Sequence, residues 1–242
     1  AQFGFSYCGT ELEQLLEDSS VDAVCIGTRQ RTHADFTIQA LNAGKHVFVE
    51  KPMVVDQEQL HSVCDAYRKA NLQRPTGLMV GLNRRFAPLT TQLKSAFPAH
   101  EPKQMIYRVN SGHIPTSTWL HEPQEGGGML IGEMCHFVDL MQFLCDEEPV
   151  SVFAQGLTLN NKKIADQDNL LIVISFQGGS VGTLGYSTVG SKAFPKERLE
   201  VYGSGRGAVV DGIRSLLAVS GGKFDKTKAC MPAKEHELDD AA

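Results

Sequence analysis

The sequence predicts an α/β chain in two parts: an incomplete doubly wound parallel sheet in residues 1–86, then a mostly antiparallel open sheet with one long helix in residues 87–242. Three observations support this prediction. In the first part, short apolar runs alternate with amphipathic helices, which is typical of right-handed βαβ crossovers. In the second part, apolar runs follow one another through short turns, which is typical of antiparallel pairing. One long apolar stretch of helical length lies between the first two of these runs.

Three helices and three strands are expected in the first part. The helices span Thr10–Glu17, Thr32–Ala43 and Asp56–Ala70, and the strands span Val21–Thr28, Lys45–Glu50 and Pro75–Leu82. We expect the Thr10 hydroxyl to cap the first helix, and Gly44 to end the second helix in the left-handed conformation. The strand at Val21–Thr28 is a nearly continuous apolar run, as expected where a parallel sheet is buried on both faces.

Six strands are expected in the second part: Gln104–Val109, Val150–Leu159, Asn169–Phe176, Ser180–Thr188, Arg198–Tyr202 and Ala208–Asp211. Alternation along the third and fourth of these strands leaves Leu171, Val173, Val181 and Leu184 to be covered. One helix cannot cover both faces of a sheet. We therefore expect the uncovered face to bind a second copy of the chain and form a homo-oligomer.

The composition is that of a globular protein and narrows the classes of partner. The chain has 242 residues with a net charge of −5, and 42% of them are hydrophobic. Because no basic cluster occurs, neither nucleic acid nor an anionic membrane surface is an expected partner. No apolar run reaches the roughly 18 residues that span a bilayer, and no leader pattern opens the sequence. The six cysteines are scattered without Cys-x-x-Cys spacing, which predicts a reducing, cytoplasmic location without disulfides.

The first candidate for chemistry is Glu50-Lys51-Pro52, at the carboxyl end of a predicted parallel strand. Ligands bind beyond this end of the strands in open α/β sheets, and Pro52 biases Lys51 towards an extended backbone. A lysine in that position can hydrogen-bond a substrate oxygen and stabilise the negative charge that develops on it. The alternative is a solvent-exposed lysine without a role, which these residue types by themselves favour.

The second candidate is the glycine loop Gly126–Gly128 and the apolar helix that follows it to Cys145. Glu133, His136 and Asp139 are spaced three apart, so they form a polar stripe on a helix that must be largely buried. Histidine is the usual general acid or base near neutral pH, and adjacent carboxylates orient it and favour its protonated form. A structural cap or a hydrogen-bonded core histidine is the alternative.

Three other chemistries are less well supported. No cluster of His, Cys, Asp and Glu has zinc spacing, so we expect no metal site, and no G-x-S-x-G elbow indicates a hydrolase. The segment Gly203–Ala208 fits the G-x-G-x-x-G/A dinucleotide fingerprint literally, with Asp225 at a suitable distance. However, the segment after it is short for a crossover helix and is interrupted by Gly212. A hairpin turn is therefore the preferred interpretation of Gly203–Ala208.

These motifs together resemble a known family. Four motifs occur in the order typical of the glucose-fructose oxidoreductase/inositol dehydrogenase/rhizopine catabolism (Gfo/Idh/MocA) oxidoreductases. They are Thr28 followed by His33, Glu50-Lys51-Pro52, Asn83-Arg84-Arg85-Phe86, and the glycine loop leading to His136. The resemblance covers nearly the whole chain. The Gly-Glu-x-x-His variant looks most like members fused behind a zinc alcohol-dehydrogenase-like module.

The resemblance implies a Rossmann domain that binds NAD or NADP, and a sheet domain that carries the substrate site. It implies that Lys51 and His136 are catalytic, and that Glu133 orients the substrate or the histidine. The cofactor-binding residues that it implies are Thr28, His33, Glu50, Lys51, Asn83 and Arg84. We expect Lys51, Glu133 and His136 to converge on one crevice between the domains, and the substrate to be a small polyol or sugar.

The sequence departs from the family pattern in two places. The family commonly has an aspartate four residues before the histidine, where this chain has Gly132 followed by Glu133. The first βαβ unit, which carries the glycine-rich turn that binds pyrophosphate, needs roughly 30 residues, and they are missing before the first predicted helix. We therefore expect an N-terminally truncated Rossmann domain that by itself binds NAD(P) weakly or not at all.

Two functions are consistent with these expectations. In the first, the full-length protein is an NAD(P)-dependent oxidoreductase acting on a hydroxyl or keto group of a sugar or cyclitol, although this chain alone is inactive. In the second, the chain is a non-catalytic fragment or assembly module whose sheet provides contacts between copies.

Overall fold

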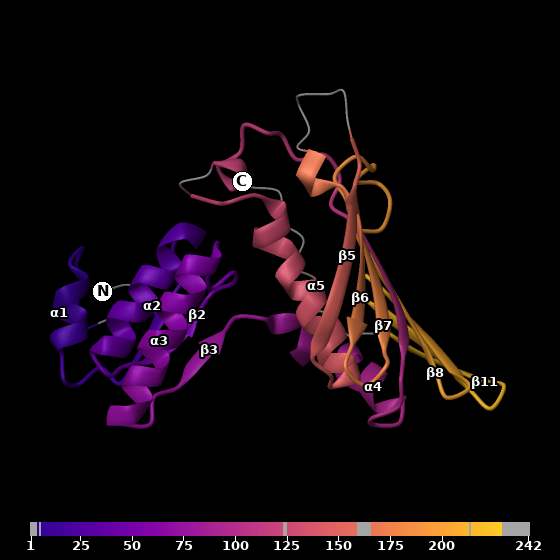
Figure 1. Cartoon of the computed structure of the whole chain (residues 1–242), viewed down its shortest axis with the longest axis horizontal. Helices are drawn as coiled ribbons and strands as arrows, with labels where there is room; N and C mark the ends of the chain where they lie inside the picture. Colours follow the sequence, from indigo (N-terminus) through magenta and orange to yellow (C-terminus); the bar gives the residue numbers. More distant parts are fainter. Residues whose placement is uncertain (1–3, 5, 123–124, 159–165, 213, 229–242) are drawn as a thin grey trace. The chain divides into compact units, whose positions relative to one another are not determined.

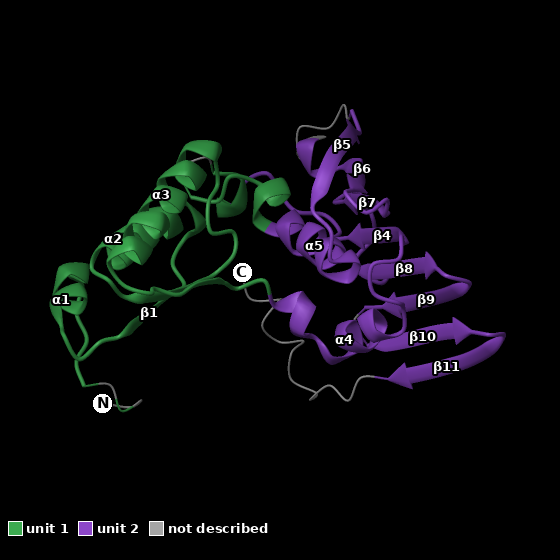
Figure 2. Ribbon diagram, turned by 60° about the horizontal axis from the view of Figure 1, so that its bottom comes forward, with its two compact units in different colours: residues 1–82, 119–132 green, residues 83–118, 133–242 purple. Residues whose placement is uncertain are grey.

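The computed structural model describes residues 4, 6–122, 125–158, 166–212 and 214–228. The chain divides into two compact units, shown in green and purple in Figure 2. Unit 1 comprises Ala1–Leu82 together with Trp119–Gly132, and unit 2 comprises Asn83–Thr118 and Glu133–Ala242. The chain thus returns to unit 1 for one short segment, which nothing in the sequence indicates.

Unit 1 has the alternating architecture that the sequence predicts (Figure 1). Its strands are β1 (Ala23–Ile26), β2 (His46–Val49) and β3 (Leu78–Val80), which pair in parallel in that order, and its helices are α1 (Leu12–Glu17), α2 (His33–Asn42) and α3 (Gln57–Gln73). Val24, Ile26, Val47 and Val49 pack in one buried cluster with Leu41 of α2 and Ala66 of α3. Cys25 and Met79 point to the other face of the sheet and are exposed.

The helix ends in unit 1 confirm one predicted cap and correct another. Gly44 has a φ of +70°, and the backbone N–H groups of Gly44 and Lys45 donate to Leu41 and Ala40, as in a left-handed C-cap. The expected Thr10 cap is wrong. Helix α1 starts at Leu12 after Glu11 without a side-chain cap, because the Thr10 hydroxyl lies one residue too early and donates instead to the Glu11 carboxylate.

Unit 2 is built on an eight-stranded sheet in the order β11-β10-β9-β8-β4-β7-β6-β5. The strands are β4 (Gln104–Asn110), β5 (Pro149–Gly156), β6 (Leu170–Phe176), β7 (Val181–Ser187), β8 (Glu197–Gly203), β9 (Arg206–Asp211), β10 (Ser215–Ser220) and β11 (Lys223–Lys228). All pairs are antiparallel except β4 with β7. The expected strand end at Leu159 lies outside the described residues.

Two details of this sheet bear on the sequence analysis. Ser204 and Gly205 both have positive φ in a two-residue turn that joins β8 to β9, the geometry of a type I′ hairpin. The glycine segment at Gly203 is therefore a hairpin and not a dinucleotide loop. Strands β10 and β11 were not predicted. Strand β11 is polar and largely exposed and so lacks an apolar pattern, whereas β10 is a short apolar run that the sequence analysis did not assign.

The helix α5 (Met129–Cys145) packs on one face of this sheet. Phe137 is fully buried against Tyr107 of β4 and Tyr186 of β7. Leu184 has no exposed surface, so the expectation that it needs a partner copy to cover it is wrong. Its pairing with Ile172 on the buried face, rather than with the exposed Leu171, explains the difference.

The opposite face of the sheet carries exposed apolar side chains, as predicted for Leu171, Val173 and Val181. Leu171 is 68% exposed, and Phe153 of β5 is exposed to the same degree beside Val173.

Unit 2 also contains the short helix α4 (Pro88–Ser95) and a 3-10 turn at Asn83–Phe86. Within the described residues, no helix has the length and apolarity needed to cross a membrane.

Candidate functional site

The carboxyl ends of the strands in unit 1 bring several predicted residues together. Thr28 lies just after β1, Glu50 and Lys51 follow β2, and Gly81 follows β3. A Cβ atom on Gly81 would lie 3.1 Å from a carboxylate oxygen of Glu50, so the Glu50 side chain crosses over the end of β3. In a parallel sheet this edge is where ligands bind.

His33 ties two of these loops together. Its Nδ1 lies 2.8 Å from the carbonyl oxygen of Pro52, and its Nε2 lies 2.9 Å from that of Thr28. The ring is buried, and both of its nitrogens face backbone. His33 is thus placed to position Thr28 and the Lys51-Pro52 segment, while its predicted contact with a cofactor stays a prediction.

Lys51 makes a defined contact with the start of α5. Its Nζ donates to the carbonyl oxygen of Gly132 at 2.9 Å. A Cβ atom on Gly132 would lie 3.0 Å from the side-chain nitrogen of Gln30, so the buried Gln30 amide occupies the space that a side chain would need. The structure therefore accommodates a glycine where the family commonly has aspartate, and the backbone supplies the oxygen for Lys51.

The polar stripe of α5 in unit 2 consists of Glu133, His136 and Asp139, as its spacing predicts. All three side chains have little exposed surface, at 12% for Glu133, 6% for His136 and 9% for Asp139. Asp139 accepts two hydrogen bonds from the Arg85 guanidinium, one of them from Nε at 3.0 Å. The Arg85 cation therefore compensates the charge of the Asp139 carboxylate, which reduces the electrostatic effect of Asp139 on the His136 imidazole.

Glu133 is the centre of a hydrogen-bonded network. Its Oε1 lies 2.8 Å from the Nζ of Lys196, and its Oε2 accepts from the hydroxyls of Ser111, at 3.0 Å, and Tyr186. Burial acts to raise the pKa of Glu133, but the Lys196 charge and the three hydrogen bonds outweigh it and hold the pKa below its ordinary value. Glu133 is therefore ionised near neutral pH.

The pKa values of two partners of Glu133, Lys196 and Tyr186, are shifted upwards. Burial acts to lower the pKa of Lys196, but the Glu133 carboxylate outweighs it and raises that pKa. Burial first, and then Glu133, raises the pKa of the Tyr186 hydroxyl. Both groups thus stay protonated and donate to Glu133, which suits Glu133 for orientation rather than for proton transfer.

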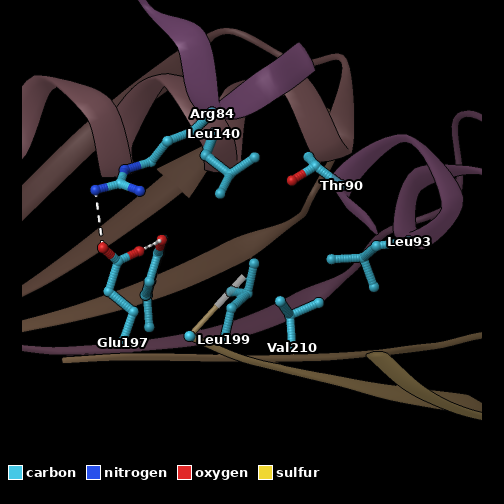
Figure 3. Close-up of a pocket in the computed structure, with 9 residues that line it drawn as sticks. Arg84, Thr90, Leu93, Leu140, Glu197, Leu199 and Val210 are labelled. Carbon is cyan, nitrogen blue, oxygen red and sulfur yellow. Dashed lines mark hydrogen bonds and ion pairs between the residues drawn. The ribbon is translucent and has the colours of Figure 1, made fainter. Parts of the chain in front are cut away.

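Arg84 forms a buried ion pair with Glu197 (Figure 3), and its predicted contact with a cofactor stays a prediction. Its Nη2 lies 2.8 Å from Oε1 of Glu197, and the two side chains are 13% and 8% exposed. The Tyr107 hydroxyl donates to the other oxygen of Glu197 at 2.8 Å, and the guanidinium lies 5.0 Å from the centre of the Phe137 ring. Arg84 is therefore held within unit 2, beside a cavity of about 10 Å³.

The predicted site residues thus fall into two groups. Unit 1 brings together Thr28, His33, Glu50 and Lys51, and unit 2 brings together Glu133 and His136, while Asn83 is exposed at the start of unit 2. Convergence of Lys51, Glu133 and His136 stays a prediction. Sequence reasoning missed Arg85, Ser111, Tyr186 and Lys196, because they lie far apart in sequence and only sheet pairing brings them to α5.

Comparison with known proteins decides the family. Residues 1–77 match the model of an oxidoreductase family with an NAD-binding Rossmann fold, and residues 99–209 match the C-terminal domain of GFO/IDH/MocA proteins. The chain belongs to the GFO/IDH/MocA oxidoreductase family. The Rossmann-like domain followed by a mostly antiparallel sheet domain, expected from the resemblance, is thereby confirmed.

Several members of the family are similar along most of the chain. A myo-inositol 2-dehydrogenase of Thermotoga maritima is 29% identical over 85% of this chain and 61% of the relative. A scyllo-inositol 2-dehydrogenase (NAD(+)) of Bacillus subtilis is 30% identical over 88% of this chain and 63% of the relative. The chain therefore spans only part of the length of these relatives.

Solved structures show the same fold. A levoglucosan dehydrogenase in complex with NADH superposes with a TM-score of 0.78 at 22% identity, over 94% of this chain and 66% of that one. A UDP-N-acetylglucosamine 3-dehydrogenase from Acidithiobacillus ferrooxidans gives a TM-score of 0.75 at 23% identity, over 93% of this chain and 69% of that one. At these identities the likeness concerns the fold.

Proposed function

We propose that the whole protein is an NAD(P)-dependent oxidoreductase that transfers hydride between the nicotinamide and a hydroxyl or keto group of a sugar or cyclitol. Family membership and the inositol dehydrogenases among its relatives support the proposal. The observation that carries it is the hydrogen bond from Lys51 to Gly132. Gly132 is the last residue of unit 1 and lies in the first turns of α5, so the bond fixes the Lys51 ammonium at the N-terminal end of this helix.

Each residue has a distinct role in this proposal. During oxidation, His136 accepts the proton of the substrate hydroxyl, and it returns a proton to the oxygen during reduction. The Lys51 ammonium hydrogen-bonds the reacting oxygen and stabilises its negative charge. Glu133, ionised and fixed by three donors, orients the neighbouring groups. NAD(P) supplies or accepts the hydride.

The residues of unit 1 fit one end of the cofactor better than the other. Thr28, Glu50 and Lys51 lie at the strand ends, where the nicotinamide half would bind. Pyrophosphate is bound by a glycine-rich turn and the helix N-terminus behind it, and the only literal fingerprint in this chain, at Gly203, is a hairpin. We therefore expect the 242-residue chain to bind NAD or NADP with a Kd near 1 mM or weaker, about −4 kcal/mol.

Three further features belong to the same proposal. The exposed apolar face around Phe153, Leu171 and Val173 binds the same face of a second copy, which makes the protein a homo-oligomer. The whole protein also carries a zinc alcohol-dehydrogenase-like module, in line with the Gly-Glu-x-x-His variant around His136. The proposed location is the cytoplasm.

The proposal is tested by measuring NAD(P)-linked oxidation of a panel of cyclitols and sugars by the native protein. We expect turnover of at least one neutral polyol, and its loss when Lys51→Met is introduced. Absence of turnover with every polyol and both cofactors would favour the alternative, a non-catalytic assembly module. Calorimetric titration of NADH and NADPH into the 242-residue chain tests the expected weak binding separately, and micromolar affinity would refute it.

A further inference from the structure

The network around Glu133 contains one group, the Lys196 ammonium, with more N–H donors than the network uses. The Lys196 side chain is 49% exposed, whereas Glu133 is 12% exposed. A lysine ammonium carries three N–H donors. Among the described residues, Lys196 Nζ contacts one acceptor, the Glu133 carboxylate. Donors therefore remain on the exposed side of Lys196.

The position of Lys196 is fixed by its backbone and by its partner. The N–H of Asn110, at the end of β4, donates to the carbonyl oxygen of Lys196 at 2.7 Å. The Asn110 side chain donates to the carbonyl oxygen of Ser191 at 2.8 Å, which holds the preceding loop. Because the chain and the ammonium are both anchored, binding a ligand would cost Lys196 little further conformational entropy.

The charges around His136 indicate which ligand suits this group. Glu133 is neutralised by Lys196, and Asp139 is neutralised by Arg85. The oxygens of Glu133 are occupied by Lys196, Ser111 and Tyr186, so the network offers donors rather than acceptors. A region that offers donors without net charge suits a neutral ligand rich in hydroxyl or keto oxygens.

We propose that Lys196 is a substrate-binding residue, which donates hydrogen bonds to oxygens of a neutral polyol beside His136, and that its pairing with Glu133 sets the preference for neutral over acidic sugars. Glu133 and His136 are one helical turn apart on α5, so a substrate at the histidine lies within reach of a donor held on Glu133. This inference rests on the proposed function and specifies its substrate class.

The test measures equilibrium binding of myo-inositol and of glucuronate to the 242-residue chain by calorimetry and NMR. Lys196→Met should weaken myo-inositol binding at least about tenfold, because a hydrogen bond from a charged donor is lost. Lys196→Arg should retain most of the affinity. Lys192→Met removes an exposed lysine from the same loop and is the matched control, with unchanged binding. Glu133→Gln leaves Lys196 uncompensated and should shift the preference towards glucuronate.

A second readout covers the case in which Lys196→Met fails to fold. In the wild-type chain, myo-inositol should shift the Nζ resonance of Lys196 and leave that of Lys192 in place. The inference is overturned if the wild type binds no polyol, if Lys196→Met binds myo-inositol as tightly as the wild type, or if the Lys196 resonance does not move. Binding that depends on Lys196 in a protein without NAD(P)-linked turnover would instead refute the proposed function alone.

Discussion

Replacing Arg84 with methionine distinguishes a structural role of this residue from cofactor binding. The change removes the cationic partner of Glu197 from a pair whose side chains are only 13% and 8% exposed. Glu197 would keep the Tyr107 hydroxyl as a donor but would otherwise be a buried, uncompensated charge. Breaking such a pair costs about 3–5 kcal/mol, so we expect the free energy of unfolding to fall by about that amount.

The assay is urea denaturation followed by circular dichroism, with NADH affinity measured on the same variant of the whole protein. Arg198→Met is the matched control, because Arg198 pairs with Glu200 and Asp211 at an exposed position and should cost at most about 1 kcal/mol. A loss below about 1 kcal/mol for Arg84→Met, or a variant of unchanged stability that no longer binds NADH, would refute the structural assignment of Arg84.

Three further predictions concern the Glu133 network and the buried and exposed faces of the unit 2 sheet. The pKa of Glu133 is depressed in the folded state. The ionised carboxylate therefore stabilises the fold above the unfolded pKa of about 4.3, and this stabilisation is lost as the pH falls through the folded pKa. The denaturation midpoint of Glu133→Gln should depend less on acid pH than that of the wild type. Leu184→Ala should lower the free energy of unfolding by about 2–5 kcal/mol, because this side chain is fully buried. Leu171→Lys should keep the fold but shift the mass in light scattering towards the monomer, and an unchanged mass would exclude this face from the interface.

The parts of the fold that were predicted have strong local patterns. The alternation of apolar runs and helices defines β1, α2, β2 and α3, since each buries one periodic face. The length and apolarity of α5 predicted a buried helix, and its three-residue spacing predicted the polar stripe. The glycine pair near Gly203 predicted a hairpin because a two-residue turn with positive φ favours glycine.

The rest could not be predicted from local sequence. Strand β11 is polar and exposed, so no apolar period marks it. Glu133 is paired with Lys196 and Ser111 because β4 pairs with β7 and the loop before β8 folds back onto Asn110, and such long-range register is not encoded in residue spacing. Arg84 and Arg85 share one motif, yet one binds Glu197 and the other Asp139, which depends on the sheet beneath them.

The central claim is that His136 performs the proton transfer of an NAD(P)-linked oxidation. It is tested most directly by comparing kcat of the native protein and of its His136→Asn variant with the same polyol and cofactor, followed by NADH or NADPH absorbance. A positioned acid or base contributes about 10²–10⁴-fold to the rate. We therefore expect kcat to fall at least about 100-fold while NADH affinity stays the same, and a variant that retains the wild-type kcat would contradict the account.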